Sequence, residues 1–325
     1  MSKTFSFVAL AILLIALGAC KENKQQQAFK VQADRFADIS VLRYQVPDFE
    51  TLSLKQKKLV YYLSQAALCG RDIFFDQNGK YNLAIRKTLE AVVRSYGGDT
   101  KAEEYGKFMT YVKQVWFANG IYHHYSNDKF VPGFSEAYFR TLVKQSDASL
   151  LPLGEGKTVD DLLKVIAPIM FDASIHPKKV CQTSGKDLVT NSAANFYAGV
   201  SEKEAAAFYQ KLKKGNDPEP PSYGLNSKLV KENGKIVEQV WKVDGLYGSA
   251  IKEIVSWLEK AATVAENEQQ KKSIELLISY YKTGNLKTFD EYNINWLKDT
   301  VSAVDFVNGF IESYSDPLGL KANWE

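Results

Sequence analysis

Residues 228–241 read Lys228-Leu-Val-Lys-Glu-Asn-Gly-Lys-Ile-Val-Glu-Gln-Val-Trp241, and this stretch decides the fold class. Two short runs with apolar pairs, Leu229-Val230 and Ile236-Val237, lie on either side of Asn233-Gly234. Such runs are typical of strands, and Asn-Gly between two of them is the strongest short signal for a β-hairpin. The stretch therefore predicts two antiparallel strands joined by a tight turn.

The sequence on both sides of this hairpin has mostly helical periodicity. Apolar residues recur at helical spacing in ranges 59–67, 89–93, 108–116, 246–265 and 273–281. Capping boxes, in which a Ser or Thr is followed three residues later by an acid or Gln, predict helix starts at Ser53, Thr158, Ser201 and Thr288. We therefore predict an α+β fold that is predominantly helical with a small antiparallel β element. Phe310 to Tyr314 is a further candidate strand of that sheet.

The balance of charge argues against nucleic acid as a partner. The chain of 325 residues has 41 basic and 38 acidic side chains, which gives a net charge of +3. The two signs are mixed along the whole length and form no basic stripe. Proteins that bind nucleic acid through its phosphates need such a stripe, so we expect no nucleic-acid partner.

The first twenty residues have the pattern of an export signal. Lys3 precedes an apolar stretch from Phe5 to Leu17, which is shorter than the roughly 20 residues that span a bilayer. Leu17-Gly-Ala-Cys20 then resembles the lipobox of bacterial lipoproteins, in which the Cys thiol is lipidated. An ordinary cleaved signal followed by a chance Cys is the alternative interpretation.

Three segments follow from this pattern. Residues 1–20 are the predicted lipoprotein signal peptide, residues 21–38 a polar tether, and residues 39–325 the folded portion. We expect the protein in the bacterial cell envelope, held to the membrane through lipid on Cys20, on either the periplasmic or the outer surface. Cys69 and Cys181 are then left, and a disulfide between them stays open. Cys69 lies in an apolar helical pattern that favours a small buried side chain.

The residues alone provide no complete catalytic set. The three histidines are His123, His124 and His176, and no HExxH, GxSxG or Walker-type motif occurs. Adjacent histidines point in different directions on a strand or a helix, so His123 and His124 are poorly placed to share one metal ion. Loop or surface positions are the preferred interpretation for all three. We expect no metal ligands in this chain.

Two local clusters contain more chemistry than packing needs. The first covers residues 116–134, with aromatic rings, the two adjacent imidazoles and several turn-forming residues. The second covers residues 305–319 and contains Glu312 and Tyr314. Two residues apart, these side chains would project from the same face of an extended segment. A carboxylate beside a phenol can hold an ammonium group and donate a hydrogen bond to an oxyanion. The alternative is that both are surface residues after the last helix.

Several stretches resemble the bacterial branch of the dipeptidyl peptidase III family. The likeness extends from about residue 40 to the last residue, and its most specific part is Asn308-Gly-Phe-Ile-Glu-Ser-Tyr-Ser-Asp-Pro317. The other matching stretches are Leu42-Arg-Tyr-Gln-Val-Pro47, Leu59-Val-Tyr-Tyr-Leu-Ser-Gln-Ala-Ala-Leu68, Gly70-Arg-Asp-Ile73, Asp76-Gln-Asn-Gly-Lys-Tyr-Asn82 and Ser222-Tyr-Gly-Leu-Asn-Ser227.

The resemblance implies a zinc-dependent exopeptidase that releases dipeptides from the free N-terminus of short peptides. The fold would then be part of a two-lobed metallopeptidase, with this chain as the N-terminal, non-zinc lobe. It implies that Glu312 binds the peptide's ammonium group and that Tyr314, as a catalytic and substrate-binding residue, donates a hydrogen bond to the scissile carbonyl. Asn308 and Asp316 match the same block, and we assign them a structural role.

The chain departs from the family in one large respect. The family's zinc ligands and catalytic Glu lie on an HExxGH-type motif and a Glu-Glu-containing motif well downstream of the matching block, and we expect neither motif within these 325 residues. We therefore expect a truncated part that binds no zinc, needs the missing C-terminal half as its partner, and is inactive alone. The alternative is a catalytically dead envelope lipoprotein that binds peptides. An unrelated helical lipoprotein is a third possibility.

Overall fold

The computed structural model describes residues 29–213 and 217–324. The chain divides into two units, Met1–Val46 and Pro47–Glu325, which are treated separately. The predicted signal peptide, Cys20 and the first part of the predicted tether lie outside the described residues.

The first unit contains a β-hairpin in which β1 (Gln32–Phe36) pairs antiparallel with β2 (Ile39–Leu42). Ala37 makes the turn with a left-handed φ of 47°. The prediction of a polar tether over residues 21–38 is therefore wrong from Gln32 onward. Polar composition misled it, because the hydrogen bonds between two strands come from main-chain groups and do not depend on apolar side chains.

In the second unit, β4 (Ser227–Glu232) and β5 (Lys235–Val240) form the predicted antiparallel hairpin. Asn233 and Gly234 have φ values of 48° and 77°, the left-handed conformation that a two-residue hairpin turn requires. A third strand, β3 (Tyr197–Ala198), pairs with β4 in parallel. This sheet is therefore mixed, whereas the sequence predicted only antiparallel pairing.

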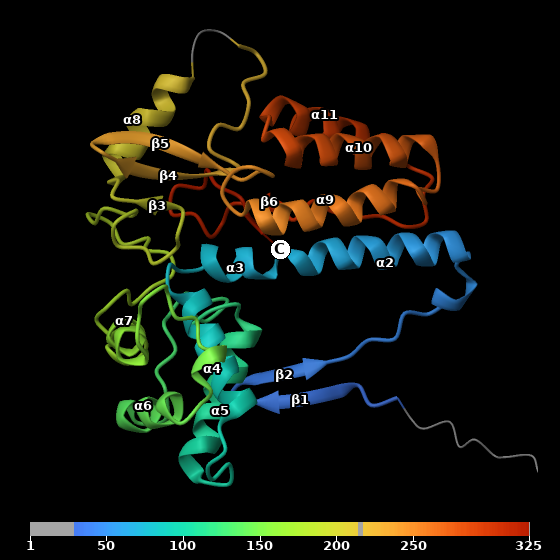
Figure 1. Cartoon of the computed structure of the whole chain (residues 1–325). Coiled ribbons are helices and arrows are strands. Elements are labelled where there is room, and N and C mark those ends of the chain that lie inside the picture. The colour runs from blue at the N-terminus through green and yellow to red at the C-terminus, as the bar shows by residue number, and fades with distance from the viewer. Residues whose placement is uncertain (1–28, 214–216, 325) are drawn as a thin grey trace, which may run out of the picture. The chain divides into compact units, whose positions relative to one another are not determined.

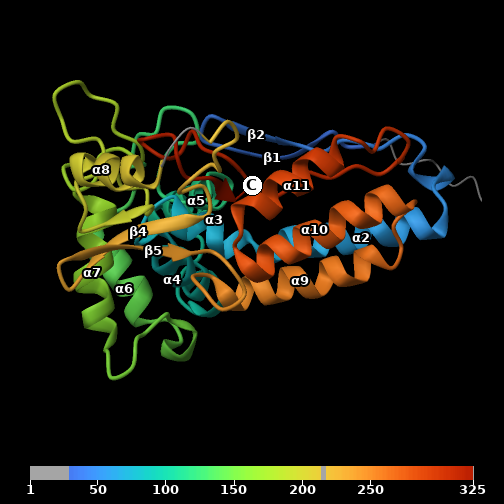
Figure 2. The ribbon, with the colours of Figure 1, turned by 90° about the horizontal axis from the view of Figure 1, so that it is seen from above.

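Helices are the main secondary structure of the second unit, as predicted. α2 lies beside α9, α9 beside α10, and α10 beside α11, which the two views in Figures 1 and 2 show. Within the described residues, none of the helices combines the length and apolar character needed to cross a membrane. The α-helices are α2 (Leu54–Cys69), α3 (Arg71–Gln77), α4 (Asn82–Ser95), α5 (Glu103–Phe117), α6 (Glu136–Lys144), α7 (Val159–Phe171), α8 (Glu202–Leu212), α9 (Gly248–Ala262), α10 (Glu268–Thr283) and α11 (Leu286–Trp296), with short 3₁₀ helices at Phe49–Thr51 and Ala148–Leu150.

Side-chain caps set where several of these helices begin. The predicted cap at Thr288 is wrong, because α11 begins at Leu286 and Asn285 is its N-cap. The Asn285 side chain accepts hydrogen bonds from two first-turn N–H groups, including that of Thr288, so the first turn already has its partner. The other three capping boxes are confirmed, with reciprocal hydrogen bonds in the pairs Ser53–Gln56, Thr158–Asp161 and Ser201–Glu204.

Two large clusters of buried apolar side chains hold the second unit together. The α9–α10 core combines side chains of α2, α9, α10 and α11 with those of two short strands, β6 (Phe310–Glu312) and β7 (Asn323–Trp324). The α4–α5 core combines side chains of α4, α5, α6 and α7. The seven-residue helix α3 takes part in both, since Ile73 packs in the first core and Phe75 in the second. The helix α3 therefore joins the two cores.

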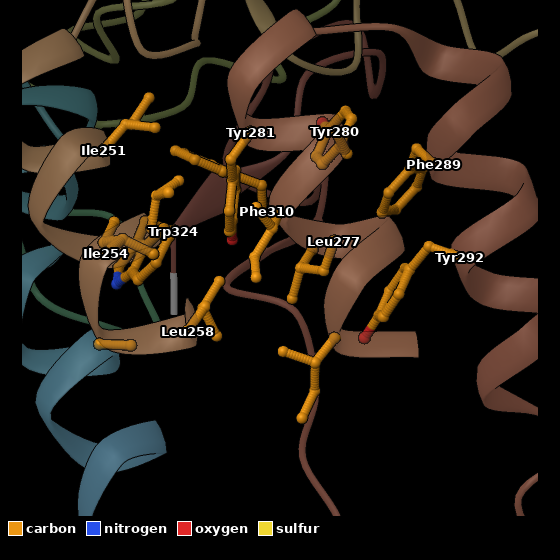
Figure 3. Packing of buried hydrophobic residues seen from close by; sticks show 14 of the residues in the cluster. Ile251, Ile254, Leu258, Leu277, Tyr280, Tyr281, Phe289, Tyr292, Phe310 and Trp324 are labelled. Carbon is orange, nitrogen blue, oxygen red and sulfur yellow. The ribbon is translucent and has the colours of Figure 1, made fainter. Parts of the chain in front are cut away.

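The remaining sheet consists of β6 (Phe310–Glu312) and β7 (Asn323–Trp324), which pair antiparallel. The strand predicted near Phe310 exists, but its expected place in the hairpin's sheet is wrong. Phe310 instead contacts the hairpin region through its side chain: its ring stacks on that of Trp241, with centroids 4.9 Å apart. Figure 3 shows Phe310 beside Tyr281 and Trp324 in the α9–α10 core.

Residues distant in the sequence meet where α2 joins α3. The indole of Trp324 lies so close to Gly70 that a Cβ at this position would be 1.8 Å from the ring, so only Gly fits. Close by, Gln77 accepts a hydrogen bond from the backbone N–H of Trp324 at 2.7 Å and donates one to the carbonyl of Ala322 at 3.3 Å. The strand β7 thus packs against the junction of α2 and α3 and is hydrogen-bonded to α3.

Both cysteines of the second unit are free thiols. Cys69 is half-buried at the end of α2, and its Sγ donates to the carbonyl of Gln65 at 3.2 Å. Burial, with the nearby charge of Glu253, raises the pKa of the Cys69 thiol. Cys181 is buried. The disulfide that the sequence left open is therefore not formed.

Candidate functional site

Glu312 ends the short strand β6, whose beginning is fixed in the α9–α10 core. Phe310 is 1% exposed among aromatic rings, whereas Glu312 is exposed. The pairing shifts register between Phe310↔Trp324 and Glu312↔Asn323, which marks an irregularity in the strand. The Glu312 carboxylate is therefore carried on an anchored strand and stays accessible to a ligand.

Asn308 fixes the chain just before this strand. Its side chain is 3% exposed, and its Nδ2 donates a hydrogen bond to the carbonyl of Phe310 at 2.9 Å. Its Oδ1 accepts the hydroxyl hydrogen of Tyr281, whose pKa burial raises well above the ordinary range. Both polar ends of a buried amide are thus satisfied inside the protein. Asn308 holds the backbone of β6 in place, which is a structural task.

Asp316 organises the turn that follows β6. It is 4% exposed, and burial raises the pKa of its carboxyl group, although the backbone hydrogen bonds it accepts oppose that effect. The hydroxyl of Tyr197 donates to its Oδ2 at 3.0 Å. Three backbone N–H groups also donate to the carboxylate, at 3.2, 2.8 and 3.0 Å, from Leu318, Leu320 and Lys321.

Lys321 lies beneath this turn with no exposed surface. Its Nζ donates to the hydroxyl of Tyr209 at 2.6 Å and approaches the carbonyl of Gly224 at 3.4 Å and the hydroxyl of Ser227 at 3.5 Å. Glu238 accepts hydrogen bonds from both hydroxyls, at 3.0 and 2.5 Å. Burial lowers the pKa of Lys321 to about 8, although nearby carboxylates oppose this. A polar network therefore supports the turn from inside.

Tyr314 lies in this turn and is 61% exposed. The sequence predicted an extended segment in which Glu312 and Tyr314 share one face, but the strand stops at Glu312. The prediction of an extended conformation is wrong for Tyr314. The carboxylate of Asp316 accepts hydrogen bonds from the backbone N–H groups that follow it, and these bonds form a turn. Both side chains are nevertheless exposed, and only Ser313 lies between them in the sequence. A carboxylate can pair with an ammonium group and a phenol can donate a hydrogen bond, so the pair can bind a polar ligand.

Comparisons with known proteins agree with this segment's resemblance. Residues 204–325 match the model of Peptidase family M49. Dipeptidyl peptidase 3 of Nematostella vectensis is 26% identical over 252 residues, which cover 69% of this chain and 34% of that protein. Dipeptidyl peptidase 3 of Homo sapiens is 24% identical over 316 residues, which cover 85% of this chain and 42% of that protein. The chain is related to the dipeptidyl peptidase III family.

Solved structures give the same relation at the level of the fold. The structure of dipeptidyl peptidase III from Caldithrix abyssi matches with a TM-score of 0.54 and 19% identity, over 85% of this chain and 40% of that one. The chain spans less than half the length of the curated dipeptidyl peptidases that it matches.

A zinc site needs several ligands close together in space. Within residues 29–213 and 217–324, no three His, Cys, Asp or Glu side chains are grouped so that they could hold a metal ion. Protein zinc sites take three or four such ligands. His123 and His124 lie in a loop, as the preferred interpretation had it, and there their rings come together with centroids 4.4 Å apart, which neither a strand nor a helix would allow so easily.

The first sequence cluster, residues 116–134, forms packing contacts in this dipeptidyl peptidase III relative. Lys129 donates to the carbonyls of Ile169 and Ile175 at 3.1 and 2.5 Å, and so caps the C-terminal end of α7. Tyr122 donates its hydroxyl hydrogen to the carbonyl of His176 at 3.0 Å. Tyr125, by contrast, is 84% exposed.

A polar cavity of about 280 Å³ is a feature that the sequence did not reveal. His176 and Lys228 line it, and Lys228 donates from Nζ to Asn195 at 2.6 Å. Asn195 in turn donates to Asp76 at 3.0 Å, and Tyr247 donates to the same carboxylate oxygen at 2.7 Å. The nearest signal in the sequence is the polar stretch 76–82, which belongs to the family resemblance. The wall comes from residues 79–82, 121–122, 169, 176, 192–195, 197–199 and 228.

Proposed function

We propose that this chain forms the peptide-binding wall of a zinc-dependent dipeptidyl peptidase, an enzyme that releases dipeptides from the N-termini of short peptides. The observation that carries the proposal is the contrast within one segment. Glu312 and Tyr314 are exposed, whereas Asn308 and Asp316 beside them are buried and hydrogen-bonded. A segment held this firmly from inside presents its two exposed side chains at a fixed place, which favours binding.

Each of the two side chains has a defined task in this proposal. Glu312 pairs with the ammonium group at the peptide's N-terminus, because a carboxylate and a cation form a strong charge-assisted hydrogen bond. Tyr314 donates its hydroxyl hydrogen to the scissile carbonyl as negative charge develops on that oxygen. Recognition of a free N-terminus is what separates an exopeptidase from an enzyme that cuts within a chain.

The zinc ion and its ligands come, in this proposal, from outside the 325 residues. The sequence has no HExxGH-type motif. When bound, the metal would supply an activated water. These residues alone are therefore proposed to bind peptides without hydrolysing them. A catalytically dead lipoprotein that binds peptides is the second candidate, favoured by the absence of a metal-ligand group among the described residues.

The proposed location is the bacterial cell envelope. It rests on the export pattern of residues 1–20 and on the position of Cys20 after Leu17-Gly-Ala. Lipid on Cys20 would tether the peptide-binding wall to a membrane. Labelling with radioactive palmitate in a bacterial host tests this, since Cys20→Ser should abolish incorporation and Cys69→Ser should not.

Calorimetric titration with short peptides tests the proposed binding. Tetra-alanine with a free N-terminus should bind the purified chain, and its N-acetylated form should bind much more weakly. Glu312→Gln should lower the affinity for the peptide with a free N-terminus by about tenfold to a hundredfold, because a hydrogen bond between charged groups is lost. The matched control is Glu291→Gln, on the exposed surface of α11.

Two outcomes would contradict the proposal. Equal affinity for the free and acetylated peptides would exclude recognition of the ammonium group by Glu312. Release of dipeptides at a normal rate by this polypeptide, abolished by a zinc chelator, would show that the metal site lies within these residues. Tyr314→Phe should weaken binding of the peptide. The control Tyr44→Phe, at an 82% exposed tyrosine, should leave peptide binding unchanged.

A further inference from the structure

The polar cavity beside α4 has a basic wall. Lys80, His176 and Lys228 line it, and none of the described residues that line it is acidic. Burial and then the charges of Lys129 and Lys80 lower the pKa of His176. The positive charges of two lysines therefore act on His176 in the cavity wall. A site of this kind attracts negative charge.

An amide donor in the wall lacks an acceptor. Asn82 is 1% exposed and lines the cavity, and its Oδ1 accepts the backbone N–H of Ile121 at 3.2 Å. That bond fixes which end of the amide is the oxygen, so Nδ2 is the end left over. Among the described residues Nδ2 has no hydrogen-bond partner. A buried N–H group without an acceptor costs free energy, and a ligand oxygen would remove that cost.

The backbone at the same place favours an anion as well. Helix α4 begins at Asn82, and within the described residues no side chain caps its N-terminus. The first N–H groups of a helix carry partial positive charge, and anions bind readily beside them. Gly79, Lys80 and Tyr81, which precede this helix, also line the cavity. Lys80, the side chain of Asn82 and the start of α4 therefore line one cavity.

We propose that this cavity is a binding site for a small oxyanion, either a phosphate or a carboxylate. Its volume of about 280 Å³ lies at the lower end of ligand pockets, which suits a small ion or a dipeptide-sized molecule. Lys228 and Lys80 supply charge, and Asn82 Nδ2 supplies a directional hydrogen bond. Asp76, whose charge acts on Lys228, does not line the cavity, and its carboxylate accepts hydrogen bonds from Asn195 and Tyr247.

The site is separate from Glu312 and Tyr314, neither of which lines the cavity. One residue connects the two places: Tyr197 lines the cavity, and its hydroxyl is bonded to Asp316 in the turn that carries Tyr314. The oxyanion site does not depend on the proposed peptidase function. Glu312→Gln should leave anion binding unchanged, which separates the failure of one proposal from the failure of the other.

Calorimetric titration of the full chain at constant ionic strength tests the site. The probes are inorganic phosphate, acetate, Ala-Ala and Ala-Ala amide, with chloride as the reference anion. Lys80→Met should lower the affinity for the probe that binds by about tenfold or more, because a charged hydrogen-bond partner is lost. Lys80 is exposed, so this change does not endanger folding. Lys272→Met, at an exposed lysine of α10, is the matched control and should change nothing.

Asn82→Asp gives a second, independent variant. It keeps the oxygen that accepts the N–H of Ile121 but replaces the donor with negative charge, so it should abolish binding while circular dichroism stays unchanged. Phosphate binding without a response to Ala-Ala would identify phosphate as the ligand, and a preference for Ala-Ala over its amide would identify a carboxylate. The proposal is overturned if no probe binds more tightly than chloride, or if Lys80→Met and Lys272→Met behave alike.

Discussion

Replacing Lys321 with Met should change how the stability of the chain depends on pH. The side chain has no exposed surface, and burial lowers its pKa from 10.5 to about 8. Between these two values the unfolded chain binds more protons at this residue than the folded chain does. The free energy of unfolding therefore rises with pH in that window, because losing the proton relieves the cost of a buried ammonium group. Below about pH 8 that cost is fully present.

The size of the effect follows from the difference between the two pKa values. Complete deprotonation of Lys321 in the folded chain would raise the free energy of unfolding by roughly 3 kcal/mol, since each pKa unit is worth about 1.4 kcal/mol. Only part of it develops between about pH 7 and about pH 9, where we expect a gain of about 1 kcal/mol. Thiols and the terminal amine titrate in the same range, but equally in wild type and variant. The difference between the two proteins therefore isolates Lys321.

Urea unfolding of both proteins at several pH values, followed by tryptophan fluorescence, measures this difference. The free energy of unfolding of the wild type should rise relative to that of Lys321→Met by about 1 kcal/mol over the range. Lys272→Met is the control and should parallel the wild type. If wild type and Lys321→Met also ran parallel, Lys321 would titrate normally and the reasoning about its burial would be refuted.

Three further predictions concern stability, each measured by urea unfolding. Phe310→Ala should lower the free energy of unfolding by about 3–5 kcal/mol, because the ring fills the α9–α10 core; a loss similar to that of Ile311→Ala, at the exposed neighbour, would contradict this. Asn233→Ala should cost about 1–2 kcal/mol through its left-handed backbone, whereas Asn233→Gly should cost little; equal losses would exclude backbone strain. Ser53→Ala should cost about 1 kcal/mol by removing the cap of α2, and an unchanged midpoint would show that the cap is dispensable.

The parts of the fold that the sequence predicted depend on contacts between near neighbours. The turn at Asn233-Gly234 needs two left-handed residues in succession, and the cap at Ser53 needs a partner three residues later. Both requirements are visible in a short window of sequence. The prediction at Thr288 was wrong for the same local reason, since Asn285 was an equally good cap that lay closer to the true start.

The parts that were missed depend on packing between distant segments. Nothing near Phe310 indicates that its partner strand lies at Asn323–Trp324 and not in the hairpin, because the choice is made by aromatic contacts with Trp241 and Trp324. The polar cavity is a stronger example. Lys80, His176 and Lys228 each look like ordinary loop or surface residues until the fold brings them to one wall.

The contact of β7 with Gln77 bears on how the protein is made. Gln77 and its hydrogen-bond partner Trp324 are 247 positions apart. At about 5–20 residues per second, a ribosome needs roughly 10–50 s to produce the second after the first. Throughout that interval the Gln77 amide and the bare backbone at Gly70 lack their native cover. A nascent chain in this state is a natural client for chaperones that shield unfinished surfaces.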